Sequence, residues 1–232
     1  MAYLYQTYIY QPILQALIFI YHNLAFHDLG LAIIILTTLI RIILLPLFYK
    51  GAKDQTLLQR LSPQIKKIQG DHKDNKEKQA KALMNFYREH RVNPFSGILL
   101  LILQLPIIIA LYQVFLKGLS AEIFGNQMFL GLINLGQKNL WLAAFAALIQ
   151  FFYGRLSMAP QPAGQSGQAV NQKTAFNPQA SVTKMMTWMG PFLTLFILVS
   201  LPAAIGLYWG ISTVFSLAQQ LVINKKIHQQ FK

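Results

Sequence analysis

The chain has 232 residues, of which 54% are hydrophobic and only 12% are charged, and its formal net charge is +13. Soluble domains usually carry about 25% charged residues, so this composition excludes an ordinary soluble domain and indicates a membrane protein. The chain contains no cysteine, which excludes disulfides, thiol catalysis and cysteine-bound metals.

Residues 1–27 are rich in tyrosine and apolar side chains but are poorly suited to crossing a bilayer. The uninterrupted apolar run from Ile13 to Tyr21 is much shorter than the roughly 20 residues that a spanning helix needs. We therefore predict an extracytoplasmic segment whose residues 8–26, approximately, form an amphipathic helix that lies at the extracytoplasmic surface of the membrane. The alternative is that these residues form an additional span. Five tyrosines are expected at headgroup level: Tyr3, Tyr5, Tyr8, Tyr10 and Tyr21.

Five apolar stretches within residues 28–223 fit the length of a membrane span. Eleven of the twenty basic residues lie from Lys50 to Arg91, and others follow the third stretch and end the chain. Because Lys and Arg concentrate in cytoplasmic loops, we expect the N-terminus outside and the C-terminus inside, with a basic cytoplasmic tail at 224–232. The net charge then reflects orientation rather than a specific nucleic-acid partner. The predicted spans are residues 28–49, 95–117, 138–157, 183–200 and 203–223.

Arg41 lies near the middle of the apolar run from Leu29 to Tyr49 in the first predicted span, and this run is otherwise free of charge. An ionised arginine at that depth costs on the order of 2.5–3.5 kcal/mol on insertion scales, and arginine does not lose its proton in proteins. It must face water, an anion or a polar pocket. Thr37 and Thr38 precede it by one turn, so its helical face is partly polar. A wet, positively charged cavity and a structural arginine bonded to backbone carbonyls are both compatible with this pattern.

Residues 51–92 are predicted to form a cytoplasmic helical hairpin with a basic outer face. Leu57, Leu61, Ile65 and Ile68 recur at helical spacing in the first arm. Ser62-Pro63 matches an N-cap followed by a first-turn proline, so the first arm is expected to restart there. Ala80, Leu83 or Met84, and Tyr87 form the matching stripe of the second arm.

Residues 158–182 are rich in Gln, Ala, Pro and Gly and contain almost no large apolar side chains. This composition predicts a flexible cytoplasmic loop between the third and fourth spans.

The last predicted span carries a polar stripe at helical spacing, formed by Trp209, Ser212 or Thr213, Ser216 and Gln220. Such a stripe faces a common space or packs against another helix. Gln104, in the second span, is equally compatible with lining a cavity and with an interhelical hydrogen bond.

The sequence contains no recognisable catalytic motif. There is no phosphate-binding loop, H-E-x-x-H pair or nucleophile elbow, and the five histidines lack the spacing of metal ligands. Apart from Asp28, at the boundary of the first span, the predicted spans contain no acidic residue, so a carboxylate proton relay is missing. We expect no enzyme activity, cofactor or metal.

Several segments, taken in order, resemble a known family. They are TTLIRIILLPL around Arg41, SPQIKKIQ in the hairpin, NPFSGILLLILQLPIIIALYQVF, FLGLINLGQKN, and MMTWMGPFLTLFILVSLPAAIGLYWGISTVFSLAQQ. In this order and spacing they are similar to the YidC/Oxa/Alb membrane-protein insertases. The resemblance covers nearly the whole chain, from about Pro12 to Gln220. It is closest to a short bacterial form, without the large extracytoplasmic domain or the lipid-modified cysteine of some relatives.

The resemblance implies an all-α membrane protein of the bacterial plasma membrane, with five spans around a positively charged hydrophilic groove open to the cytoplasm and to lipid. It implies an insertase and chaperone whose partners are nascent membrane-protein clients and membrane lipids. The ribosome and the Sec translocon are candidate partners, although the basic tail is short. The family's groove arginine, glutamine and tryptophan correspond to Arg41, Gln104 and Trp209. The predicted client-binding groove comprises Arg41, Thr37, Thr38, Gln104, Trp209, Ser212, Thr213, Ser216 and Gln220.

Two other functions remain open from the residues alone. A small anion channel or transporter could use Arg41 as its selectivity charge, but no internal repeat or second intramembrane charge supports it. A scaffold for other membrane proteins is the third possibility. Ion flux and client insertion measured in the same vesicles separate all three.

Overall fold

The computed structural model describes residues 2–117, 124–125, 127–157 and 178–230, and this part of the chain is almost entirely helical, as the sequence predicts. Its only strands are two-residue partners in an antiparallel hairpin. The elements are α1 (Ala2–Tyr5), the π-helical turn η1 (Gln6–Tyr10), α2 (Gln11–Asn23), α3 (Leu29–Ile43), α4 (Leu45–Arg60), α5 (Ser62–Asp71), α6 (Lys76–Glu89), α7 (Ser96–Lys117), β1 (Met128–Phe129), β2 (Ile133–Asn134), α8 (Leu140–Ser157), α9 (Pro178–Val199) and α10 (Ala203–Gln230).

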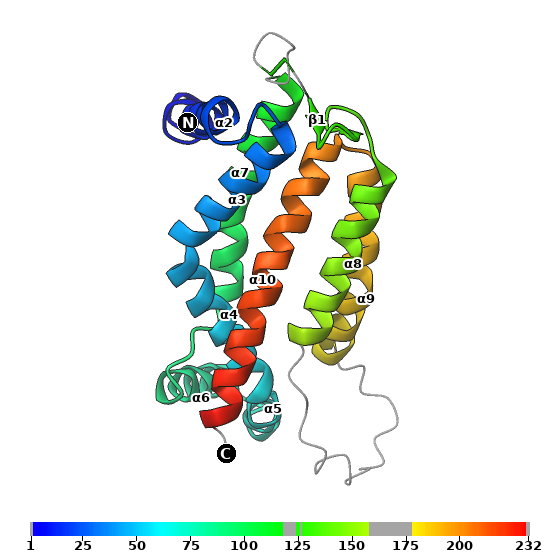
Figure 1. Ribbon diagram of the computed structural model, residues 1–232. Coiled ribbons are helices and arrows are strands. Elements are labelled where there is room, and N and C mark those ends of the chain that lie inside the picture. Colours follow the sequence, from blue (N-terminus) through cyan, green and yellow to red (C-terminus); the bar gives the residue numbers. More distant parts are fainter. Residues whose placement is uncertain (1, 118–123, 126, 158–177, 231–232) are drawn as a thin grey trace.

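The helices form an elongated bundle around α10. Figure 1 shows α3, α4 and α7 on one side of α10 and α8 and α9 on the other. At one end, which we call the loop end, lie α2 and the two short strands β1 and β2. At the opposite end, the hairpin end, lie α5, α6 and the last turns of α10. The two termini therefore lie at opposite ends of the bundle.

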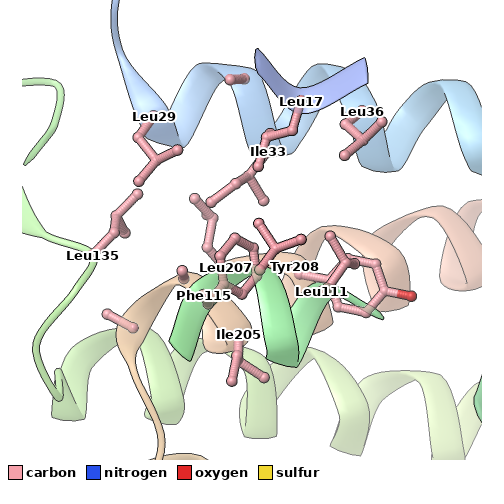
Figure 2. Packing of buried hydrophobic residues seen from close by; sticks show 14 of the residues in the cluster. Leu17, Leu29, Ile33, Leu36, Leu111, Phe115, Leu135, Ile205, Leu207 and Tyr208 are labelled. Carbon is pink, nitrogen blue, oxygen red and sulfur yellow. The ribbon is translucent and has the colours of Figure 1, made fainter. Parts of the chain in front are cut away.

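The main hydrophobic core lies toward the loop end, where α2, α3, α7 and α10 meet. Figure 2 shows Leu17 of α2 close to Ile33 of α3, with Leu111 and Tyr208 nearby. Two tyrosines that the sequence places at headgroup level belong to this core: Tyr10 is 8% exposed and Tyr21 is 2% exposed. Tyr10, at the end of η1, and Tyr21, on the inward face of α2, pack within the protein, and Tyr3 and Tyr8 are exposed. The position of these tyrosines at headgroup level stays a prediction.

The first predicted span, residues 28–49, is divided into two helices. Asp28 caps α3 by accepting a 2.9 Å hydrogen bond from the Leu31 N–H. Helix α3 ends at Ile43, and the chain continues as α4, whose axis makes an angle of 69° with that of α3. Pro46 lies in the first turn of α4, where a missing N–H is tolerated, whereas inside a continuous helix it would remove a hydrogen bond and clash.

Length and composition alone identify one helix of the described chain, α8, as able to cross a membrane. The bent pair α3 and α4 would add a second if it counts as one span. Shorter apolar stretches run over Ile102–Phe115 in α7 and Met189–Val199 in α9. The topology of five spans therefore remains a prediction.

The predicted hairpin, residues 51–92, is shorter in the structure. Residues 51–60 belong to α4, which packs against α10 through a small buried cluster of Ala52, Ile223 and Ile227. The remaining arms are α5 and α6. Helix α5 restarts at Ser62 as predicted, but the capping position is Leu61 rather than Ser62.

The seam between α5 and α6 is thin, since neither helix contains a fully buried residue. Ile65, Leu83 and Tyr87 are half-buried, whereas the predicted seam positions Ala80 and Met84 are exposed. Burial raises the pKa of the Tyr87 phenol above its ordinary value. A single hydrogen bond of 2.7 Å, from Gln79 Nε2 to the Gln69 carbonyl, joins the two arms near their turn.

Two further predictions concern the second half of the chain. The loop expected at 158–182 falls mostly outside the described residues, and 178–182 belong to α9. Helix α10 runs without a break to Gln230, so most of the expected basic tail, 224–232, continues the helix of the last predicted span.

Candidate functional site

A cavity of about 450 Å³ lies between α3, α4, α7, α8 and α10. Ten of its thirteen lining residues carry a polar group, and none of the thirteen is an aspartate or glutamate. Six of the nine residues predicted for the client-binding groove line it: Arg41, Gln104, Trp209, Ser212, Thr213 and Ser216. The other seven are Phe48, Gln55, Leu100, Ile108, Gln150, Tyr153 and Tyr208.

Arg41 supplies the charge of this cavity and is only 8% exposed. Its Nε donates a 2.9 Å hydrogen bond to Ser212 Oγ, and its Nη2 donates to the same oxygen. The guanidinium lies 4.5 Å from the centre of the Phe48 ring, in a cation–π arrangement. Within the described chain, no carboxylate lies at ion-pair distance from it. The positive charge therefore remains uncompensated by any acidic group of the described residues.

Helix α10 aims its polar stripe at the cavity because residues 209, 212, 213 and 216 share one helical face. The hydroxyls of Thr213 and Ser216 also bond to carbonyls one turn earlier, Thr213 Oγ1 to Trp209 O at 2.8 Å and Ser216 Oγ to Ser212 O at 3.1 Å. Another face of α10 carries Gly210, where an added Cβ would lie 3.0 Å from the Phe145 ring of α8. This glycine lets the two helices approach closely.

Interhelical hydrogen bonds link the cavity walls. Gln104 Nε2 of α7 donates to the Tyr208 hydroxyl of α10 at 3.1 Å. Gln104 thus both lines the cavity and bridges two helices, which were alternatives from the sequence. Thr213 Oγ1 donates a longer bond of 3.4 Å to Gln150 Oε1 of α8. Tyr208 and Gln150 were not predicted as site residues, although Gln150 carries the same signal as Gln104, an amide inside an apolar span.

The three remaining predicted residues do not line the cavity. Thr37 and Thr38 donate to carbonyls of their own helix, Ile33 O at 2.6 Å and Ile34 O at 2.8 Å. Gln220 is 2% exposed and donates to Thr56 Oγ1 of α4 at 2.9 Å. The two threonine hydroxyls thus bond within their own helix, and the Gln220 amide links α10 to α4.

A buried carboxylate that the sequence did not single out lies toward the hairpin end. Asp54 of α4 is 5% exposed and accepts a 2.6 Å hydrogen bond from Ser96 Oγ of α7. A hydrogen bond to a charged acceptor is stronger than a neutral one. This pair fastens α4, one wall of the cavity, to the start of α7.

No metal centre is indicated in the described residues, since they contain no group of three His, Cys, Asp or Glu side chains that could hold an ion. The cavity instead combines one cation with amide, hydroxyl and aromatic groups. It is suited to hold water and to attract an anionic group.

Comparison with known proteins places the chain among bacterial membrane proteins. Residues 19–230 match the family described as 60Kd inner membrane protein. A Clostridium tetani protein named Membrane protein insertase YidC is 34% identical over 206 residues, which cover 88% of this chain and 84% of that one. Membrane protein insertase YidC 2 of Bacillus anthracis is 33% identical over 91% of this chain and 78% of its own length.

Longer relatives match over only part of their length. A Helicobacter pylori protein named Membrane protein insertase YidC is 32% identical over 202 residues. That match covers 87% of this chain and 34% of the relative. The chain therefore spans about a third of the length of this longer relative.

Proposed function

Because this chain belongs to the 60Kd inner membrane protein family, the family of the YidC, Oxa and Alb proteins, we propose that it is an insertase and chaperone for membrane proteins in the bacterial inner membrane. The proposed mechanism rests on the burial of Arg41 and on its lack of an acidic partner among the described residues. This nearly buried cation lies in a cavity where ten of the thirteen lining residues carry a polar group.

The mechanism follows from the cost of moving a polar segment through lipid. The hydrocarbon core is about 30 Å thick, and backbone groups that enter it lose their hydrogen bonds to water. A cavity that holds water and that the client tail enters from the hairpin end would shorten that path. The charge of Arg41 attracts acidic residues of the translocated tail, and this attraction is stronger where the local dielectric is low.

Release of the client into the membrane then needs no nucleotide or other external energy source. Once the tail has entered the cavity, the apolar segment of the client moves sideways into lipid. Burial of apolar surface drives that step at about 25 cal/mol per Å². The polar hydroxyl and amide groups around Arg41 hold the tail by exchangeable hydrogen bonds, so the tail can leave again.

For the topology, we propose five spans with the loop end outside and the hairpin end in the cytoplasm. The termini lie at opposite ends of the bundle, which suits an odd number of crossings. The hairpin end carries most of the basic residues, in keeping with the positive-inside rule. In this orientation α5 and α6 meet clients first, and the ribosome and the Sec translocon are proposed partners at the same end.

The direct test is client insertion by the purified protein in liposomes. Protease protection of the translocated tail reports insertion, and a halide-sensitive dye trapped in the same vesicles reports anion flux. We expect protein-dependent protection without flux. Anion flux without client insertion would instead support a channel, and neither activity would support a scaffold.

A further inference from the structure

A second cavity, which we call the lateral pocket, lies between the first turn of α4 and the C-terminal half of α10. Its volume is about 550 Å³, and it shares no lining residue with the cavity around Arg41. Leu45, Pro46, Phe215 and Val222 form its apolar walls. Leu45 is 39% exposed and Val222 is 48% exposed, so the lateral pocket opens sideways on the surface of the bundle, where a membrane protein meets lipid.

One end of the lateral pocket carries a cation beside an aromatic ring. Lys226 Nζ lies 5.4 Å from the centre of the Tyr49 ring, and both residues line the pocket. Lysine and tyrosine near the end of a span keep their apolar parts in hydrocarbon and their polar ends among the headgroups. Lys226 lies toward the hairpin end of α10, so the apolar walls extend from the headgroup level into the hydrocarbon region.

We propose that the lateral pocket binds one anionic phospholipid. The phosphate lies against Lys226, and one acyl chain covers the apolar walls. Basic pockets between membrane helices on the cytoplasmic side are suited to anionic headgroups. The binding is independent of client insertion and is therefore tested without it.

The test is native mass spectrometry of the full chain, in detergent, titrated with phosphatidylglycerol or phosphatidylcholine of the same acyl composition. We expect one tightly bound phosphatidylglycerol and much weaker binding of phosphatidylcholine. Lys226→Ala should weaken phosphatidylglycerol binding about fivefold, the effect typical of one cation near an anionic surface.

Matched variants assign the binding to the lateral pocket. Lys225→Ala removes an equal charge from an exposed neighbour outside the pocket and should leave affinity unchanged. Ala218→Trp, which fills the pocket, should abolish the single bound lipid, whereas Val214→Trp on the exposed surface should not.

Three results would overturn the proposal. One is equal binding of anionic and zwitterionic lipids, and another is an equal loss of affinity with Lys225→Ala and Lys226→Ala. The third is a dimer that Ala218→Trp dissociates while lipid binding persists, because the lateral pocket would then hold a second copy of the chain.

Discussion

Arg41 and Ser212 are 171 positions apart in the sequence, yet two nitrogens of the Arg41 guanidinium share the Ser212 hydroxyl oxygen as acceptor, with Nε at 2.9 Å. This contact joins α3 to α10 at the centre of the bundle. A serine hydroxyl orients the guanidinium without neutralising it. Orientation and charge can therefore be separated by mutation.

Ser212→Ala should reduce the stability of the protein while the charge of Arg41 is kept. The guanidinium loses its acceptor in a nearly buried place, and a hydrogen bond to a charged group contributes about 1.5–3 kcal/mol. The melting temperature in detergent should fall, and insertion should decrease only in part. Ser216→Ala is the matched control, because the Ser216 hydroxyl bonds to a carbonyl of its own helix. Equal melting temperatures for the two variants would show that the contact with Arg41 contributes little.

The buried pair of Asp54 and Ser96 should contribute to the stability of α4 against α7. Ser96→Ala leaves the Asp54 carboxylate without this donor and should cost about 1–3 kcal/mol. The double variant Asp54→Leu with Ser96→Ala should recover part of that loss, since no unpaired charge remains buried. A double-mutant cycle on chemical denaturation measures the coupling, and strictly additive effects would contradict it.

Single cysteines test the proposed orientation without background, because the chain has none. Cysteines at Gln6 and Gly125, both exposed at the loop end, should react with a membrane-impermeant maleimide added to intact cells. A cysteine at Asn75, in the turn between α5 and α6, should react only after the membrane is opened. External labelling at Asn75 would reverse the orientation and remove the basis of the proposed path.

The role of α5 and α6 can be tested by replacing them with a linker, and the position where α4 ends determines which residues can be removed. Gln55 lines the cavity and Thr56 accepts from Gln220, so a deletion must leave α4 intact. Replacing residues 62–90 with a short Gly/Ser linker should keep the bundle folded and reduce client insertion, because the thinly packed arms are removed. A second variant replacing 55–90 should also lower the melting temperature. Normal insertion by the 62–90 variant at normal protein levels would mean that the hairpin only connects two helices.

Much of the cavity could be predicted from the sequence because a polar residue in an apolar span must find a polar neighbour. That rule identifies Arg41, Gln104 and the stripe on α10, and the structure brings them into one cavity. It fails for Thr37 and Thr38, because a threonine hydroxyl can satisfy itself on the carbonyl four residues earlier.

Other features depended on contacts that periodicity does not reveal. Asp54 falls within the predicted hairpin, 51–92, and only the packing of α4 against α7 shows that it is buried. Tyr10 and Tyr21 are residues of the type found at membrane interfaces, and their burial follows from how η1 and α2 pack against the bundle. The break after Ile43 is compatible with Pro46, but a proline alone does not distinguish a bend from the end of a helix.

The central claim is that the charge of Arg41 acts on acidic client tails. It is tested by inserting matched clients, with acidic or neutral translocated tails, into liposomes that contain wild-type protein, Arg41→Lys, Arg41→Ala or Arg41→Glu. Arg41→Lys should keep much of the activity, since a cation remains. Arg41→Ala and Arg41→Glu should lose insertion, most severely for acidic tails. If Arg41→Ala inserts acidic and neutral tails equally well at wild-type rates, the electrostatic mechanism is wrong.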